Sequence, residues 1–439
     1  MSAPPAQSLV LSFAEARHAV EQQAAHMTQG ATEVVDLLHA SGRILAELIA
    51  ADRDIPPFPR STRDGYAVQV ADLAKVPATL THVGEIKAGP QPGTIPPLNR
   101  GQAFSIMTGA PVPPGANAVV MVEYTSLRNR SVEITRSIEV GENIVAQGAE
   151  ARRGTLLLDR GERLDHAAIA LAASVGKARL RVFVRPRVAV LTTGDEIINV
   201  DAALDAKSGS MQIRNSNAYS LAAQIQEAGG VPVILPIAPD EPRRLRQLIQ
   251  RGLTSDLLIM SGGVSMGRYD LVEQVLAEMN AEFLFTGAKI QPGRPDVFGR
   301  VRSLGAGAPE KRLMHSSARR KKSARSLYQC FFGLPGNPVS TMVTFELFVR
   351  PMLEAIAGMR PRPLQFLHAR LKSEIRVNPG LMRFLPAALS GEYEHSQVEL
   401  VRWQGSGDIA ARARANCYIV IPPDREHTPA GDWVAVMLR

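Results

Sequence analysis

A short apolar run that ends in a glycine-rich loop constrains the fold of this chain more than any other feature. Residues 256–260 (DLLIM) predict a buried strand, residues 261–270 (SGGVSMGRYD) follow it, and residues 271–279 have apolar positions at helical spacing. Such a loop typically builds an anion site, because the glycines expose backbone N–H groups and the following helix contributes positive charge. We therefore expect a phosphate-binding loop with Asp270 at its rim, where a divalent metal would sit. A packing role for the glycines is the alternative.

From residue 187 onward, predicted strands alternate with predicted helices. Strands are expected over 188–191 and 231–237, and helices over 217–228 and 242–253. This alternation predicts a doubly wound parallel sheet, whose ligands bind at the carboxyl ends of the strands. Residues 192–196 (TTGDE) and the glycine-rich loop both follow strands and should line one crevice. Glu196 and Asp270 could then share a metal, with Asp195 nearby, unless the TTGDE acids only form a solvated turn.

Residues 333–341 (GLPGNPVST) predict a second anion-binding loop. Asn337 as N-cap and Pro338 at the first helical position are a strong start signal for a helix to about residue 353. Pro335 and Gly336 leave a rigid loop with exposed N–H groups before it. Residues 291–295 (QPGRP) supply a cation, Arg294.

The N-terminal and C-terminal regions have different patterns. The capping box Ser12-x-x-Glu15 predicts a helix to about residue 26, and apolar spacing predicts more helix over 31–51. Residues 66–145 predict short strands between glycine and proline turns, and residues 146–184 return to mixed structure with a helix over 164–173. We therefore expect a β domain inserted into a helical one. Residues 364–438 again predict strands, in a small barrel or sandwich.

Two polar residues of the inserted region are candidate site residues. Asp64 precedes a glycine in a turn signal, and Thr108 precedes a glycine at a strand end. Taken alone, each has a simpler interpretation, as a turn former and as a strand residue.

The net charge of +8 suggests nucleic acid, but the basic residues are concentrated in one segment. Residues 302–325 contain eight Lys and Arg and one acid, so they carry about +7 and the rest of the chain about +1. Residues 302–330 lack a hydrophobic period and predict a solvated insertion.

The sequence contains no run of 18 or more apolar residues, so it predicts no membrane-spanning helix. Only Cys330 and Cys417 are present, which excludes a disulfide scaffold or a cysteine-based zinc site and suits the cytoplasm.

Taken in order, the motifs resemble those of the MoeA/gephyrin E-domain family of molybdopterin molybdenumtransferases. They are PPFPRSTRDGYAV, IMTGAPVPPGANAVVMVE, TTGDE, IRNSN, SGGVSMGRYD, PGRP, GLPGNPVS and GSGDIAARARAN, and they cover nearly the whole chain. The resemblance implies an α/β and β multidomain protein. Its expected parts are a helical linker and dimerisation domain (1–55 plus 146–184), an inserted β domain (56–145), an α/β molybdopterin-binding domain resembling stand-alone molybdopterin adenylyltransferases (185–360), and a C-terminal β-barrel (361–439).

The resemblance also implies a reaction, its site and its partners. Molybdate would be inserted into adenylylated molybdopterin with release of AMP, assisted by Mg²⁺, in a homodimer whose subunits share the active site; a molybdopterin adenylyltransferase is a possible partner. The expected catalytic residues are Asp64, Thr108, Glu196, Asp270 and Arg294, with Glu196 and Asp270 as metal ligands. The expected substrate-binding residues are Thr193, Gly194, Asp195, Asn215, Asn217, Ser261, Gly262, Gly263, Ser265, Gly267, Pro335, Gly336, Asn337, Pro338 and Ser340.

The chain departs from the family pattern at its oxyanion site. Gln291 stands where many members have Lys or Arg, and Gly287 where some have Lys; Ala410 and Ala411 replace common serines.

Two other functions share parts of the pattern. One is a molybdopterin adenylyltransferase, whose loop usually has GGTG where this chain has GGVS. The other is a non-catalytic scaffold that binds the pterin or a partner protein.

Overall fold

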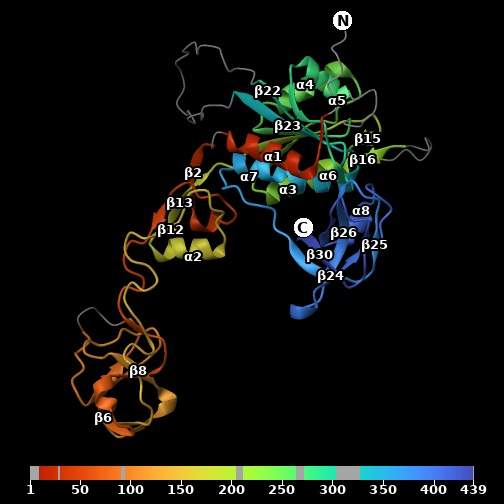
Figure 1. Cartoon of the computed structure of the whole chain (residues 1–439). Helices are drawn as coiled ribbons and strands as arrows, with labels where there is room; N and C mark the ends of the chain where they lie inside the picture. The colour runs from red at the N-terminus through yellow and green to blue at the C-terminus, as the bar shows by residue number, and fades with distance from the viewer. Residues whose placement is uncertain are drawn as a thin grey trace, which may run out of the picture.

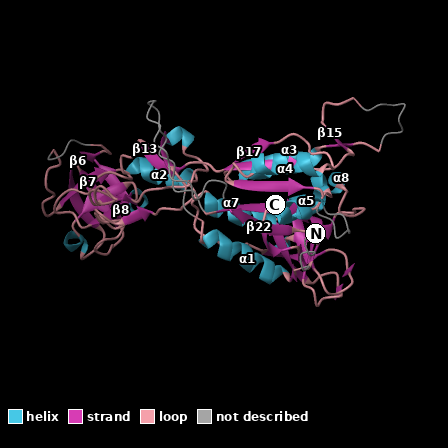
Figure 2. Cartoon of the chain, turned by 90° about the horizontal axis from the view of Figure 1, so that it is seen from above, coloured by secondary structure: helices cyan, strands magenta, loops and turns pink. Residues whose placement is uncertain are grey.

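The chain extends from a β domain at one end to an α/β domain and a barrel at the other (Figure 1). This computed structural model describes residues 9–27, 30–89, 94–203, 211–263, 271–302 and 327–438. Most of the basic insertion, at 303–326, lies outside these ranges. Seen from above, the strands β6, β7 and β8 lie at the opposite end of the molecule from α3, α4 and α5 (Figure 2). Helix α1 (Phe13–Ala25), near the start of the described chain, and strand β30 (Trp433–Leu438), near its end, both lie in the half that contains the α/β domain and the barrel.

A six-stranded sheet forms the α/β domain, in the order β17-β14-β18-β23-β22-β19. The first four strands run parallel, and β22 and β19 are antiparallel to their neighbours. The predicted strands and the doubly wound arrangement are thus confirmed for this part of the chain. The strands are β14 (Arg187–Thr192), β17 (Val231–Ile234), β18 (Leu257–Ser261), β19 (Glu282–Phe285), β22 (Val297–Arg302) and β23 (Tyr328–Leu334).

Helices cover both faces of this sheet because alternate strand residues point to opposite sides. Val188 and Val190 pack with the helices on one face, and Ala189 and Leu191 with those on the other. The first face carries α1 (Phe13–Ala25), α3 (Ser216–Glu227), α6 (Pro338–Thr344) and α7 (Arg350–Ile356); the second carries α4 (Pro242–Gly252) and α5 (Leu271–Glu278). The predicted helix from Asn337 continues from α6 through a π-helical stretch, Phe345–Val349, into α7.

The N-terminal helix is confirmed, with the capping box formed by Ser12 and Glu15. It packs against α7 in the core of the α/β domain, where Ala16 and Val20 are fully buried. The helix predicted over 31–51 is wrong. Those residues form β2 (Thr32–Asp36), a short 3₁₀ turn and β3 (Ile49–Ala50).

The error has a physical cause in the competing local signals of this segment. The β-branched pair at 34–35 suits a strand, and β2 pairs with β13 (Arg179–Phe183). Asp36 then caps the 3₁₀ turn, and Gly42 has a positive φ of 71°, which ends helical geometry. The helix predicted over 164–173 is present as α2 (His166–Ser174), and β12 (Leu156–Leu158) pairs with β3.

The inserted region folds as a six-stranded sheet in the order β8-β5-β7-β6-β10-β9, and the short strands that the turn pattern predicts there are confirmed. Its strands are β5 (Gly65–Val68), β6 (Ala78–Ile86), β7 (Gln102–Ile106), β8 (Ala118–Met121), β9 (Thr125–Arg128) and β10 (Ser131–Ile134). The chain enters it beside β4 (Arg60–Ser61) and leaves it through β11 (Ile144–Val145), and these two strands pair.

The C-terminal region closes into a barrel, because β26 pairs with both β27 and β28. Its strands are β24 (Leu367–Leu371), β26 (Met382–Ser390), β27 (Gln397–Leu400), β28 (Cys417–Ile421) and β30 (Trp433–Leu438). The α/β domain contributes β21 (Ile290–Gln291) to the edge of β26, and α8 (Ile409–Arg414) lies near α6. No helix in the described part of the chain is long and apolar enough to cross a membrane.

Candidate active site

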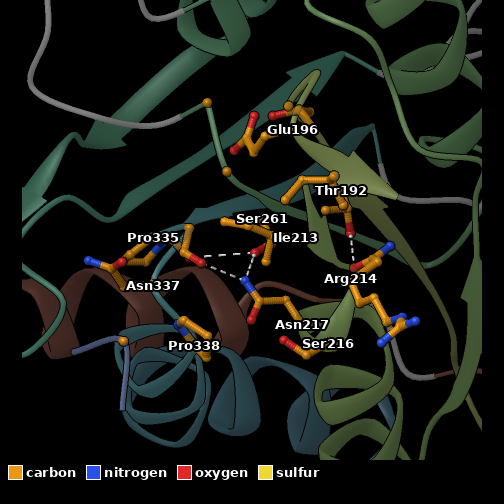
Figure 3. Close-up of a pocket in the computed structure, with 18 of the residues that line it drawn as sticks. Thr192, Glu196, Ile213, Arg214, Ser216, Asn217, Ser261, Pro335, Asn337 and Pro338 are labelled. Carbon is orange, nitrogen blue, oxygen red and sulfur yellow. Dashed lines mark hydrogen bonds between the residues drawn. The ribbon is translucent and has the colours of Figure 1, made fainter. Parts of the chain in front are cut away.

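A cavity of about 900 Å³ opens at the carboxyl ends of β14 and β18 (Figure 3). Thr192 and Ser261, the last residues of these strands, are paired in the parallel register, so the loops that follow them begin side by side. The N-terminus of α3 and the loop before α6 form further walls. The cavity therefore lies where ligands bind in doubly wound sheets.

The predicted loop residues that line this cavity come from four segments. They are Thr193, Gly194 and Glu196 after β14, Asn215 and Asn217 at α3, Ser261, Gly262 and Gly263 after β18, and Pro335, Gly336, Asn337 and Pro338 before α6.

Asn217 connects three of these segments. Its Nδ2 donates to Ser261 Oγ at 2.8 Å and to the Gly336 carbonyl at 2.7 Å (Figure 3). Asn217 Oδ1 and Thr193 Oγ1 are buried and have no hydrogen-bond partner among the described residues. Because an unpaired buried polar atom is costly, these two atoms are available to a ligand's polar groups.

Asn215 fixes the start of α3. Its Oδ1 accepts from the backbone N–H of Ala218 at 3.2 Å, which caps the helix, and from Thr192 Oγ1 at 3.1 Å. The cap therefore joins the helix N-terminus to the end of β14 and holds that terminus toward the cavity.

Glycine is required where the two strand-end loops approach each other. Gly262 and Gly263 have φ values of +90° and +66°, and a Cβ at Gly262 would lie 2.6 Å from the Thr193 carbonyl oxygen. Gly194 has φ +134°, and a Cβ there would lie 2.6 Å from Glu196 Oε2. The Glu196 carboxylate thus folds back over Gly194 at the cavity wall.

Three carboxylates lie at the ends of β14 and β17. Glu196 and Asp240 line the cavity, and Asp195 Oδ1 accepts from the Asp240 backbone N–H at 3.0 Å. Burial raises the pKa of Asp240, and the charges of Asp195 and Glu196 raise that pKa further. Such crowding of like charges favours a bound cation.

The described residues contain no group of three or more His, Cys, Asp or Glu side chains placed to hold a metal. Asp270, the second predicted metal ligand, lies outside the described residues, as do Ser265 and Gly267. Magnesium usually keeps one or two carboxylates and takes its other ligands from water and substrate phosphates. Glu196 and Asp240 fit that requirement.

The barrel contributes to the same cavity through its GSGD loop. Asn337 Nδ2 donates to Ser406 Oγ at 2.9 Å, and the Val339 backbone N–H donates to the Ser406 carbonyl at 2.9 Å. Gly407 and Ile409 line the cavity. The predicted N-cap Asn337 therefore bonds to the barrel, and its side chain makes no capping bond within α6.

Five of the predicted site residues that the structure describes do not line the cavity. One is Asp195, whose contact with Asp240 is given above, and the other four are Arg294, Ser340, Asp64 and Thr108. Arg294 is exposed and its neighbour Pro295 lines the cavity, while Ser340 is buried in α6. Asp64 and Thr108 lie together, just before β5 and just after β7, in the β domain, which stands at the other end of the molecule from the α/β domain (Figure 1). Asp64 Oδ1 accepts from the Thr108 backbone N–H at 2.6 Å and from Thr108 Oγ1 at 2.9 Å, and these bonds lower the pKa of Asp64.

Sequence reasoning missed several residues of the cavity wall. Asp240 follows β17, so the rule that led to Glu196 applies to it equally. Arg214 and Ser216 lie inside the IRNSN motif. Gly407 and Ile409 lie inside the GSGDIAARARAN motif, but the barrel reaches this cavity only through tertiary packing, so the motif alone did not place them there.

Comparison with known proteins gives a consistent result along the chain. The family model of the MoeA N-terminal region (domain I and II) matches residues 11–176, that of a "Probable molybdopterin binding domain" matches residues 189–355, and that of the MoeA C-terminal region (domain IV) matches residues 368–438. A protein of Nostoc sp. called molybdopterin molybdenumtransferase is 33% identical over 420 residues, which are 93% of this chain and 89% of that protein. One of the same name from Bacillus subtilis is 31% identical, with 93% and 90% covered.

Solved structures agree with these relatives. A crystal structure of the molybdopterin biosynthesis MoeA protein of Pyrococcus horikoshii is 30% identical to this chain with a TM-score of 0.67, and covers 98% of this chain and 99% of its own. A second structure under that title has a TM-score of 0.75 at 26% identity, with 98% and 100% covered.

Proposed function

The chain belongs to the MoeA family of molybdopterin molybdenumtransferases, and from this premise we propose that its cavity binds adenylylated molybdopterin and inserts molybdate into it, releasing AMP. The protein is thus a transferase of molybdenum cofactor biosynthesis. The observation that carries the assignment of the cavity is the parallel pairing of the ends of β14 and β18, from which two loops begin side by side, with Glu196 and Asp240 lining the same cavity.

The loops suit the phosphate groups of such a substrate. Positive φ values at Gly262 and Gly263 turn the backbone tightly at the strand end, and the residues before α6 form the facing wall. Backbone N–H groups in such turns bind phosphate oxygens. The buried, unpaired Asn217 Oδ1 and Thr193 Oγ1 would accept from N–H groups of the pterin ring.

Magnesium would be held by Glu196, Asp240 and the predicted ligand Asp270. When bound there, it would neutralise charge on the phosphate that leaves as AMP. The protein's own part is to hold the carboxylates in place: Gly194 lets Glu196 fold back, and Asp195 fixes the backbone of Asp240.

The proposal includes a homodimer with a shared site. The Asp64–Thr108 pair lies far from the cavity of its own chain, so it can act on substrate only if a second copy brings its β domain to that cavity. The partner subunit's Asp64 would then complete the site. Arg294 and the loop before α6 would attract molybdate. We place the reaction in the cytoplasm, with a molybdopterin adenylyltransferase as the donor of the substrate.

The direct test is AMP release by purified protein given molybdate, Mg²⁺ and adenylylated molybdopterin. Release that requires both molybdate and Mg²⁺ is the expected result. Tight pterin binding without AMP release would indicate a scaffold, and formation of adenylylated pterin from ATP and molybdopterin would indicate an adenylyltransferase.

A further inference from the structure

The β domain is joined to the α/β domain through an arm, which we define as residues 32–183. Between the two domains, the arm includes β2, β3, β12, α2 and β13 (Figure 1). The angle of this arm decides where the β domain, with Asp64 and Thr108, lies relative to the α/β domain. Because the β domain stands at the tip of the arm, a small rotation at the base displaces it by a larger distance. The contacts at the base therefore control its position.

Apolar packing at the base of the arm is limited. The buried cluster there consists of Ile44 and Phe183 from the arm and Ala357 and Met359 from the chain just after α7. The Phe183 ring lies against Gly358, since a Cβ at that glycine would lie 2.5 Å from the ring. Contacts between domains allow rotation unless they are large and hydrophobic. A cluster of four buried residues therefore does not fix the angle by itself.

Arg163, which lies between β12 and α2 of the arm, adds directional contacts across the same junction. Its Nη1 donates to the Glu227 carbonyl at 3.3 Å, and its Nη2 donates to the Ala228 carbonyl at 3.0 Å. These carbonyls lie at the end of α3, where the helix dipole favours a cation. Arg163 Nη2 also lies 3.6 Å from Oε1 of Glu354 in α7. One side chain of the arm thus contacts two helices of the α/β domain.

The charges at this junction are partly shielded from water. Glu354 is only 6% exposed, and its Oε1 also accepts from Arg362 Nη2 at 2.9 Å. Arg163 Nε is buried and has no hydrogen-bond partner among the described residues. Burial lowers the pKa of Arg163, and the charge of Glu354 offsets part of this effect. Because separating a partly buried ion pair is costly, the Arg163–Glu354 pair restricts rotation of the arm.

The helix α3 gives Arg163 a second connection to the cavity. Arg163 contacts the C-terminal end of α3, and Asn217 near its N-terminal end bonds to Ser261 and Gly336 in the cavity wall. However, α3 is also held independently, because it packs against β14, β17 and α6 and its first turn is capped by Asn215. The arm is therefore the element whose position depends on Arg163.

We propose that Arg163 is a positioning residue, which holds the arm at the angle that brings the β domain to the active site of the partner subunit. This inference rests on the proposed function, because the angle of the arm matters for catalysis only if the site is shared. Arg163 is not among the described residues that line the cavity. Its effect on turnover should therefore follow the arm on which it lies and not the cavity of its own chain.

The first test changes one arm at a time. A mixed dimer of Asp64→Asn and Glu196→Gln chains has one working site, formed by the cavity of the first chain and the β domain of the second. Adding Arg163→Met to the Glu196→Gln chain should lower AMP release by about tenfold or more, because it frees the arm that serves this site. Adding it to the Asp64→Asn chain should leave AMP release unchanged, because that arm serves no working site.

The matched control is Arg179→Met, which removes an exposed arginine of β13 from the same arm and should have no effect on either chain. Equal losses with Arg163→Met on either chain would show that it acts on its own cavity through α3. No loss on either chain would show that it does not hold the arm. Both results would overturn the proposal. An inactive mixture of the Asp64→Asn and Glu196→Gln chains would instead refute the shared site, and with it the catalytic part of the proposal.

The second test measures the position of the arm without substrate. Spin labels attached through Arg128→Cys in the β domain and Arg243→Cys in α4 report the distance between the two domains. Both positions are exposed, whereas the chain's own cysteines, Cys330 and Cys417, are buried and should not react. Mixing the labelled chain with an excess of unlabelled chain limits the measurement to distances within one subunit.

Pulsed electron paramagnetic resonance should give one narrow distance distribution for the wild type. Arg163→Met should broaden this distribution, and Arg179→Met should not. If Arg163→Met does not fold, Arg163→Lys should still broaden the distribution relative to the wild type, because it keeps the charge but loses the paired donors of the guanidinium. An unchanged distribution would refute the proposal whatever the outcome of the AMP assay, so this result is independent of the proposed function.

Discussion

At the scale of single residues, the proposed chemistry depends on the carboxylates of the cavity at the ends of β14 and β18. Glu196→Gln should lower Mg²⁺-dependent AMP release by about 100-fold or more, because it removes a negative ligand from the proposed metal site while keeping the side-chain shape. The neighbouring Glu241→Gln is the control, since Glu241 is exposed and does not line the cavity. Unchanged turnover in the Glu196 variant would contradict the metal assignment.

A second acid, Asp296, should make stability depend on pH. It is fully buried, neither carboxylate oxygen has a partner among the described residues, and burial raises its pKa well above the usual range. The folded chain therefore keeps this proton at pH values where the unfolded chain has lost it, so stability falls as pH rises above the unfolded pKa.

Replacing that acid should reverse the effect. Asp296→Asn should raise the free energy of unfolding at pH 8 by about 1 kcal/mol or more, and by less at pH 5, as measured by urea titration. The exposed Asp432→Asn is the control and should show no such pH-dependent gain. An equal effect of Asp296→Asn at both pH values would mean that Asp296 is already ionised in the folded chain at pH 5, and would contradict a raised pKa.

At the scale of elements, α1 depends on its capping box. Ser12 Oγ accepts from the Glu15 backbone N–H at 3.3 Å, and Glu15 Oε2 accepts from the Ser12 N–H at 2.8 Å. Ser12→Ala should destabilise the first turn by about 1 kcal/mol, seen as faster hydrogen exchange of its amides, whereas Ser12→Asp should preserve protection. Equal acceleration in both variants would show that packing, not the cap, holds this turn.

The elements also show what the sequence can and cannot predict. A capping box, a proline at the first helical position and a glycine-rich loop are local signals, so α1, α6 and the end of β18 were predictable. The segment 31–51 was not, because its apolar spacing is helical while its strand pairs with residues about 150 positions away. Asp240 was within reach of the strand-end rule. The GSGD loop stood out as a motif, but its position beside the cavity depends on how the barrel packs, which the motif does not contain.

At the scale of the whole molecule, the distance between the β domain and the cavity gives the sharpest prediction. If the proposed homodimer has a site that combines both residues, Asp64→Asn and Glu196→Gln should each inactivate it. In a mixed dimer of the two variants, one site carries both changes and the other carries neither. Unfolding an equal mixture and refolding it together should therefore restore about one quarter of wild-type AMP release, since half of the dimers are mixed and each has one intact site.

The alternative geometries give different results in this experiment. If Asp64 acted on the cavity of its own chain, every site in every dimer would carry one of the two changes, and mixing would restore nothing. If Asp64 had no role, its variant alone would be active. The matched control is a mixture of Glu196→Gln with Asp240→Asn, both of which lie in one chain's cavity, so mixing them should restore no activity. Recovery specific to the Asp64 mixture would show that an exposed turn bonded to Thr108 works in the partner's site.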